Sequence, residues 1–263
     1  MTQPTLLYYG LHANVIAFST TRRGGCSTGN YAEFNINHYC GDDEEAIRKN
    51  RQMLCQLLDI SNDRLIMPHQ VHLTETLQID DAFFTLSEED RKARLEGIDA
   101  VMTNLSGVCI GVSTADCIPL LVYDPHQHVV AAIHAGWRGT VKRIAQRTIH
   151  QMTAIYGSQL KDLIVQIGPG ISLESFEVGD EVYEAFASAG FEMGSICRRY
   201  EKWHIDLPEC NRQQLVAAGV SAGNISVLNA CTVKQSDTFF SARRLGILSG
   251  RIFTGIICNH SSR

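Results

Sequence analysis

A cysteine and a histidine whose spacing would bring them to one ion or one proton stand out in this sequence. Two apolar runs flank the turn-forming residues 124–127, a pattern typical of a β-hairpin with a four-residue loop. If Tyr123 pairs with His128, then Cys117 pairs with His134. Directly opposed residues share a face with Cβ atoms roughly 4.5–5.5 Å apart. The hairpin therefore predicts a metal site or a nucleophilic site.

A third ligand would complete a catalytic zinc site with one open position, and His72 is the natural choice. Residues three apart in an extended segment point to opposite faces, so His69 and His72 do not both serve as ligands. His69 is the more dispensable. The ordinary alternative is that Cys117 is a small buried hydrophobe and His134 a core histidine.

The same pair also allows nucleophilic chemistry. Cys117 could attack a carbonyl after activation by His134, with Asp116 or an arginine in support, as in a cysteine hydrolase. Metal occupancy distinguishes the two hypotheses, because a thiolate bound to zinc is not free to attack.

Three arginine-containing loops could bind an anion such as phosphate. Arg22 and Arg23 precede two glycines, Arg138 lies where a helix is expected to begin, and Arg243 and Arg244 follow an aromatic pair. Neither a Walker A loop nor a dinucleotide fingerprint is present. We expect substrate or phosphate binding by these five residues.

The elements that must position these residues follow from hydrophobic periodicity. The sequence predicts a helix that opens at residues 42–45 and a long amphipathic helix over 139–156 that Gly157 ends. It also predicts helices over 181–189 and over 208–218, the latter capped by Asp206, and strand-like residues at 15–20, 65–77, 100–103, 108–113, 163–167, 225–228 and 251–257. This irregular alternation favours a mixed sheet in one α/β or α+β domain.

Composition limits the class of protein. The 263 residues are 44% hydrophobic with a net charge of −5, which argues against nucleic-acid binding. Nine cysteines without a CxxC pair suit a reducing cytosol. No signal peptide and no run of about 18 apolar residues is found. We expect a cytoplasmic protein with no membrane partner.

Ten short motifs, taken together, resemble a known family. In chain order they are Thr20-Thr-Arg-Arg-Gly-Gly25, Gly41-Asp-Asp43, Asn50-Arg51, Gln70-Val-His72, Ala115-Asp-Cys-Ile-Pro119, His134-Ala-Gly-Trp-Arg-Gly139, Gly168-Pro-Gly-Ile171, Phe176-Glu-Val-Gly179, Asp206-Leu207 and residues 239–244. This order is similar to that of the laccase-domain proteins, also called multicopper polyphenol oxidase family proteins and zinc-dependent purine nucleoside phosphorylases. Cys40, Phe176 and Ala242 depart from the family pattern.

The resemblance implies a four-layered αββα sandwich with mixed sheets in a single domain over residues 1–263. It also implies Zn²⁺ held by His72, Cys117 and His134, which would be both the metal ligands and the catalytic residues. Purine nucleosides and phosphate would be the partners, with phosphorolysis of adenosine, inosine and methylthioadenosine and deamination of adenosine. A monomer or weak homo-oligomer is expected.

A binding or regulatory protein that uses the cleft without turnover is a further alternative. Copper-dependent oxidation of phenols is another, because the ligand set could also hold copper. We rank it below the other hypotheses, since a mononuclear site lacks the trinuclear cluster that four-electron reduction of oxygen requires. His126 and His128 form a His-x-His pair, but they lie at the turn end of the hairpin, about 20 Å from Cys117 at the rise of a strand.

Overall fold

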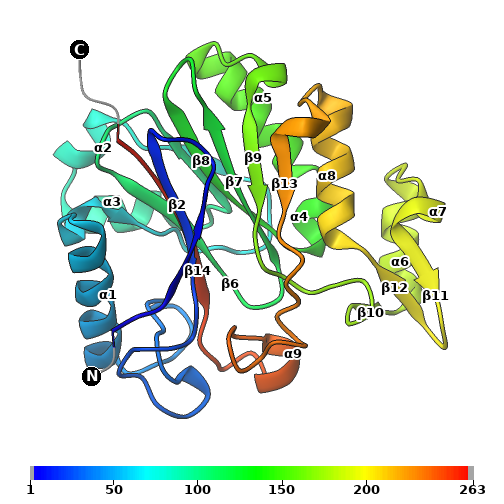
Figure 1. Cartoon of the computed structure of the whole chain (residues 1–263), viewed down its shortest axis with the longest axis horizontal. Helices are drawn as coiled ribbons and strands as arrows, with labels where there is room; N and C mark the ends of the chain where they lie inside the picture. Colours follow the sequence, from blue (N-terminus) through cyan, green and yellow to red (C-terminus); the bar gives the residue numbers. More distant parts are fainter. Residues whose placement is uncertain (1–2, 260–263) are drawn as a thin grey trace.

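Two mixed β-sheets lie face to face in the computed structural model, which describes residues 3–259 (Figure 1). The first sheet has the strand order β1–β2–β14–β6–β3. Its strands are β1 (Leu6–Tyr9), β2 (Val15–Thr20), β14 (Ile252–Cys258), β6 (Cys109–Thr114) and β3 (Leu65–Ile66). Only the β3–β6 pair in this sheet is parallel.

The second sheet has the order β13–β9–β7–β8–β5–β4. Its strands are β13 (Ile225–Val227), β9 (Ile164–Ile167), β7 (Ile118–Asp124), β8 (Val129–Ala135), β5 (Ala100–Thr103) and β4 (Thr76–Gln78). The pairs at its two edges are parallel and the others antiparallel.

A shared core joins the two sheets. Val112 and Ile256 on the first sheet pack in one cluster with Leu121 and Val130 on the second, and all four are fully buried. Every residue of β7, β8 and β14 is buried, so these strands are covered on both faces.

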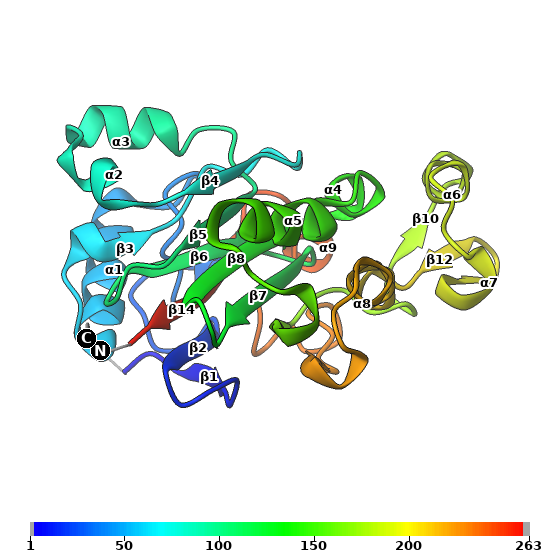
Figure 2. The same cartoon turned by 90° about the horizontal axis from the view of Figure 1, so that it is seen from above.

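Helices cover the two outer faces. Helix α1 (Glu44–Leu58) packs Leu54 against Phe18 and Phe253 of the first sheet. Helices α5 (Ile144–Tyr156) and α8 (Leu207–Ala218) cover the second sheet, where Ile149 and Leu215 join its outer cluster. Figure 2 shows α5 and the two sheets in succession. The expected αββα sandwich is confirmed.

A small antiparallel sheet lies beside α8, away from the sandwich (Figures 1 and 2). It has the order β10–β12–β11, and its elements are β10 (Glu177–Val178), α6 (Asp180–Ser188), α7 (Met193–Ile196), β11 (Cys197–Arg199) and β12 (Trp203–Ile205). Three further helices are α2 (Asp81–Thr85), α3 (Glu88–Arg94) and α9 (Ala242–Leu245).

The predicted register of the β7–β8 hairpin is wrong by two residues. Asp124 pairs with Val129, and Pro119, not Cys117, pairs with His134. The loop still has four residues but runs over 125–128, because the Asp124 carboxylate accepts hydrogen bonds from two backbone N–H groups of the turn. A shift of two residues keeps every side chain on its predicted face.

The long helix predicted over 139–156 is also wrong as one element. It is divided into α4 (Trp137–Val141) and α5, and Arg143 between them is left-handed with φ 66°. The Arg143 guanidinium donates to the carbonyl of Ala189 and lies 3.9 Å from the Phe191 ring centroid, which stabilises the break. Gly157, also left-handed, ends α5 as predicted.

The strand-like segment 65–77 is mostly a loop, with pairing in β3, in an isolated bridge between His69 and Glu96, and at Thr76 and Leu77 of β4. This loop carries His72. Its irregular backbone is held by the bridge at His69 and by the side chains of Gln70 and Asp99, in place of a strand ladder.

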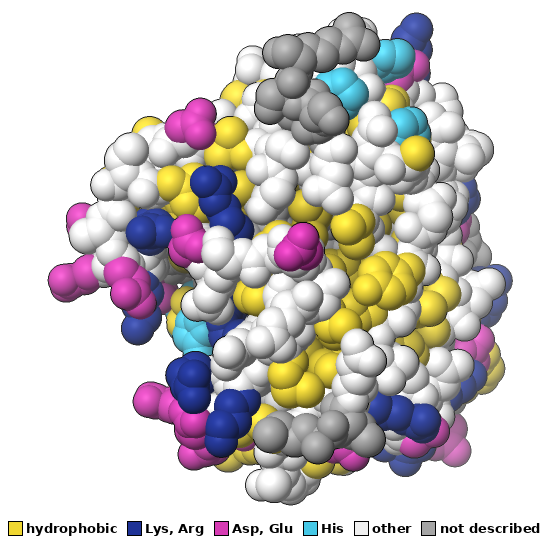
Figure 3. Space-filling model, turned by 60° about the vertical axis from the view of Figure 1, so that its left-hand side comes forward, with side chains coloured by type: hydrophobic (Ala, Val, Ile, Leu, Met, Phe, Trp, Pro, Cys, Tyr) yellow, Lys and Arg dark blue, Asp and Glu magenta, His cyan; other side chains and the backbone are white. Residues whose placement is uncertain are grey.

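Figure 3 shows a face of the molecule on which positive and negative side chains are interspersed around a hydrophobic middle. On that face no single-sign patch of the kind that nucleic acids bind is visible. Within residues 3–259, no helix is long and apolar enough to span a bilayer.

Candidate metal centre

Three side chains from three segments converge at one end of the sandwich. His72 lies in the loop after β3, Cys117 immediately before β7, and His134 near the end of β8. Each offers one ligand atom, and these atoms all lie within 4.8 Å of one another. The two imidazole rings are 4.8 Å apart between centroids and nearly perpendicular. The sequence thus selected three residues that the fold brings together.

Asp99 organises two of these three residues. Its Oδ1 accepts a hydrogen bond of 2.7 Å from His134 Nδ1, which leaves Nε2 of that imidazole as the possible ligand atom. The fully buried carboxylate also accepts from the backbone N–H groups of Val71, His72 and Leu73. A carboxylate behind a metal-binding histidine fixes its tautomer and orientation.

The backbone takes unusual conformations at two points of the site. His72 has φ 63° and Asp116, which precedes Cys117, has φ 86°. A left-handed conformation costs a residue other than glycine free energy, so the surrounding contacts must maintain it. Asp116 is held by Thr232, whose hydroxyl donates to Oδ1 at 2.6 Å, and by the backbone N–H of Arg243 at 2.7 Å to Oδ2.

Gln70 anchors the loop that carries His72. Its side-chain amide donates to the carbonyl of Ser113 and accepts from the N–H of the same residue, at 2.9 and 2.8 Å. A side chain therefore provides the pairing with β6 that a further strand residue would have provided. This explains how a loop can hold His72 beside a sheet.

Electrostatics favour a thiolate at Cys117. Burial raises the pKa of this thiol, but the charge of His134 and hydrogen bonds from both histidines outweigh burial and lower the pKa to about 6. Burial likewise lowers the pKa of His134, but the Cys117 charge and the Asp99 hydrogen bond raise it to about 9. Burial raises the pKa of Asp99 too, and the hydrogen bond and charge of His134 with the loop N–H groups lower it overall.

The donor set fits a single divalent metal ion. One thiolate sulfur and two imidazole nitrogens are typical of a catalytic zinc site with an open position. Gly136 adds to the fit, because a Cβ there would lie 3.0 Å from His72 and 3.1 Å from Cys117 Sγ. His69 is not in the cluster, since its Nδ1 bonds Glu96 and its ring stacks on a tyrosine.

A cavity of about 230 Å³ adjoins the three residues. It is lined by Asn37, Tyr39, Cys40, His69, Gln70, His72, Ser113, Thr114, Ala115, Cys117, His134, Ala242, Ile247 and Arg251. In the described part of the chain, this lining contains no aspartate or glutamate and one arginine, Arg251, which the sequence did not predict as a site residue. Two positions that depart from the family pattern, Cys40 and Ala242, are in the wall.

None of the five arginines expected to bind phosphate is in this lining. Arg22 donates to the carbonyls of Ala32 and Ser236 and is thereby engaged in joining two loops. Arg23 forms an exposed ion pair with Asp237 at 3.1 Å. Both arginines line a different, open depression.

The other three arginines lie on other surfaces. The Arg138 guanidinium stacks over the ring of Trp137 at 4.3 Å from its centroid. Arg243 touches the site through its backbone N–H to Asp116, while its side chain points to a carbonyl of β10. Arg244 donates through Nε to another backbone carbonyl.

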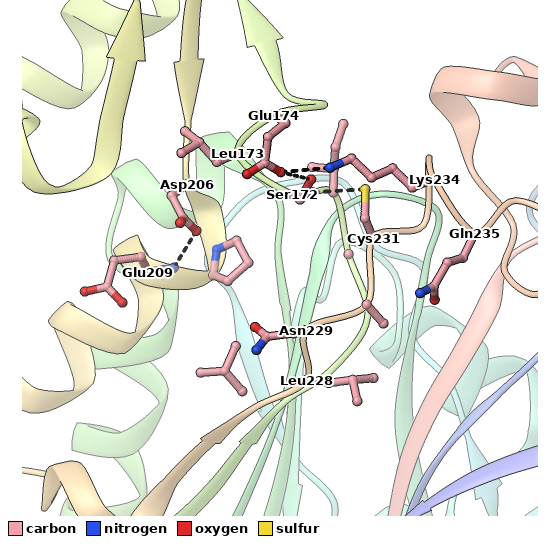
Figure 4. Close-up of a pocket in the computed structure, with 15 residues that line it drawn as sticks. Ser172, Leu173, Glu174, Asp206, Glu209, Leu228, Asn229, Cys231, Lys234 and Gln235 are labelled. Carbon is pink, nitrogen blue, oxygen red and sulfur yellow. Dashed lines mark hydrogen bonds and ion pairs between the residues drawn. The ribbon is translucent and has the colours of Figure 1, made fainter.

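A larger cavity of about 490 Å³ lies beside α8 (Figure 4). Its polar lining includes Glu174, which bonds Lys234, and Asp206 and Glu209 at the start of α8. None of the three metal-site residues lines it. A substrate that reacts at the cluster must use the smaller cavity, so we place the candidate site there.

The fold and the site define a class: αββα proteins with one cysteine and two histidines gathered at the end of the sandwich. The family model described as multi-copper polyphenol oxidoreductase laccase matches residues 16–259. The chain therefore belongs to this family, as the motifs implied.

Curated relatives carry the names of nucleoside enzymes. A purine nucleoside phosphorylase from Bacteroides thetaiotaomicron is 48% identical, over 94% of this chain and 92% of the relative. Adenosine deaminase RL5, from an unknown prokaryotic organism, is 44% identical over 92% of this chain and 93% of its own.

Solved structures agree with the fold. Bacillus licheniformis hypothetical protein YfiH superposes with a TM-score of 0.89 at 27% identity, covering 97% of both chains. YlmD from Geobacillus stearothermophilus gives 0.87 at 28% identity, covering 99% of this chain and all of its own.

Proposed function

We propose that this protein is a zinc-dependent purine nucleoside phosphorylase that acts on adenosine, inosine and methylthioadenosine and also deaminates adenosine. The observation that carries the proposal is the convergence of His72, Cys117 and His134 beside a cavity without carboxylates. The names of the relatives support both reactions. Bound zinc would supply a Lewis acid and an acidified water.

The residues of this chain would bind and orient the reactants. Asp99 holds His134 in one tautomer and fixes the loop of His72, so the donor set is preorganised. Phosphorolysis breaks the bond between ribose C1′ and the purine nitrogen and forms a bond from C1′ to a phosphate oxygen. Such a reaction depends chiefly on positioning and electrostatics, which a cavity lined by cationic and neutral polar groups provides.

Release of free base tests the proposal. Protein with measured zinc content should release hypoxanthine from inosine, and adenine from adenosine and methylthioadenosine, only when phosphate is present. Adenosine should give inosine without phosphate. Single His72→Ala, Cys117→Ser and His134→Ala variants should lose both activities. Full turnover in a zinc-free triple variant would refute the assignment.

A nucleophilic hydrolase is the second function that an observation favours, because Cys117 lies against His134 in an arrangement that promotes its thiolate. Metal content separates the two functions. Purified protein without zinc that is rapidly alkylated at Cys117 supports the hydrolase, whereas one zinc per chain that Cys117→Ser abolishes supports the phosphorylase.

We further propose a cytoplasmic location and a monomer or weak homo-oligomer. All nine cysteines are free in the structure, which suits a reducing compartment.

A further inference from the structure

Among residues 3–259, Arg251 is the one lysine or arginine in the lining of the cavity that adjoins the metal centre. The register of β14 explains its position. Ile252 pairs with Thr114 of β6 in an antiparallel register. The residue before Ile252, Arg251, is therefore next to Ala115, which comes two residues before Cys117. Arg251 therefore approaches the metal centre from the strand next to the one that leads to Cys117.

The guanidinium of Arg251 is held in place by the loop before it. Its Nη1 donates to the carbonyls of Ser249 and Gly250, and its Nη2 to that of Ile247. The backbone N–H of Arg251 donates to the Asn35 side chain at 3.1 Å. A guanidinium fixed by carbonyls is preorganised and loses little freedom when it binds a ligand.

These carbonyls do not use all the N–H donors of the Arg251 guanidinium. Among residues 3–259, Nε and one proton of Nη2 have no bonding partner, so two of the five N–H groups of Arg251 remain for a ligand. A divalent ion held by the three residues and this guanidinium together carry more charge than the Cys117 thiolate offsets, and the Asp99 carboxylate lies behind His134. No aspartate or glutamate in its lining opposes that charge.

We propose that Arg251 binds the phosphate co-substrate, because none of the five arginines predicted from the sequence is in the lining of this cavity. This inference rests on the proposed function. Arginine recognises phosphate through paired, charge-assisted hydrogen bonds, and the free donors of Arg251 meet that need. The phosphate would then lie between this side chain and the metal centre, and the nucleoside at the mouth of the cavity.

Titration of inorganic phosphate into zinc-loaded protein tests the assignment. Arg251→Met should weaken phosphate binding and raise the KM for phosphate by roughly 10- to 100-fold, and Arg251→Lys should fall in between. Arg48→Met, an exposed arginine of α1 paired with Glu45, is the matched control and should change neither value.

Two further measurements distinguish a role of Arg251 in binding phosphate from a role in holding the loop before β14. Zinc stoichiometry and adenosine deamination in phosphate-free buffer should stay within about threefold of wild type in Arg251→Met, because neither uses phosphate. Loss of zinc or of both reactions would overturn the proposal in favour of a structural role, as would an unchanged affinity for phosphate.

The proposed function and the proposed role of Arg251 can be refuted independently of each other. If wild-type protein shows no phosphorolysis, that function is refuted, and the titration of inorganic phosphate alone decides on Arg251. Weaker phosphate binding in Arg251→Met would then still support the anion site, and equal binding would overturn it.

Discussion

At the scale of single residues, Asp99 connects more of the metal centre than any of the three ligands does. Its carboxylate bonds His134 and the backbone around His72, while its own backbone carbonyl accepts from the N–H of His134 at 2.8 Å. The geometry of two ligands therefore depends on one buried side chain.

Asp99→Asn should lower zinc affinity by about 10- to 100-fold, because an amide supports the imidazole less well and can donate where Asp99 accepts. Competition with a chromophoric chelator measures the affinity, and circular dichroism checks the fold. An unchanged affinity would show that Asp99 does not position the ligands.

Gly136→Ala should weaken zinc binding with little loss of stability, because its Cβ would crowd His72 and Cys117 at 3.0 and 3.1 Å. Gly10→Ala is the matched control, since a Cβ there meets nothing within 4 Å. The same chelator competition compares the two variants. Equal zinc affinity in both would contradict the close approach described above.

The two ligands on the β7–β8 hairpin could be identified from the sequence although the predicted register of the hairpin was wrong. A shift by two keeps the face, so Cys117 and His134 remained neighbours although Pro119 took the paired position. Arg251 could not be identified in this way. It lies between Gly250 and the apolar strand β14, outside the motifs that pointed to ligands, and only the pairing of β14 with β6 reveals its place.

At the scale of elements, the helices that begin at acidic or capping residues could be predicted from the sequence. The acidic start of α1 and the Asp206 cap of α8 are confirmed, and the structure adds that Asp43 caps α1. The break at Arg143 was not predictable, because no glycine or proline marks it and its stabilising contacts are distant in sequence. The small sheet β10–β12–β11 was missed for a related reason, since strands of two or three residues carry too little periodicity.

The cap of α8 gives a pH-dependent prediction. Burial raises the pKa of Asp206, and the charges of Glu209 and Glu174 raise it further, whereas the Glu209 N–H and Arg198 lower it. The contribution of Asp206 to stability is thus complete below its usual pKa and falls as pH rises through the raised value, from about pH 4 upward.

Asp206→Asn keeps an acceptor for the Glu209 N–H and removes the charge. Its stability relative to wild type should therefore be higher at pH 7.5 than at pH 4.5 in urea unfolding. Asp206→Ala, which removes the cap, should cost about 0.5–2 kcal/mol. A constant difference between Asp206→Asn and wild type across this range would contradict the prediction.

At the scale of the whole molecule, the two sheets bury one common core, so they should unfold together. Leu121→Ala in that core should cost about 2–5 kcal/mol and shift a single transition, and Leu248→Ala, 65% exposed, should cost far less. Far-UV and near-UV circular dichroism should give coincident curves. Two separate transitions would contradict the single domain that the motifs imply.

The layer order of the sandwich was foreseen from the resemblance of ten motifs to a family, since composition and periodicity reached only a mixed sheet. Which arginines face the metal centre depends on contacts between strands far apart in the chain. Arg251 and Cys117 come together only because β14 crosses the first sheet beside β6.

The central claim is that one zinc ion on His72, Cys117 and His134 enables nucleoside phosphorolysis. Metal-free protein titrated with zinc, with hypoxanthine release from inosine and phosphate followed at each addition, tests it most directly. We predict that activity rises linearly and saturates at one zinc per chain, and that Cys117→Ser does not respond. Full activity before any zinc is added, or none at saturation, would contradict it.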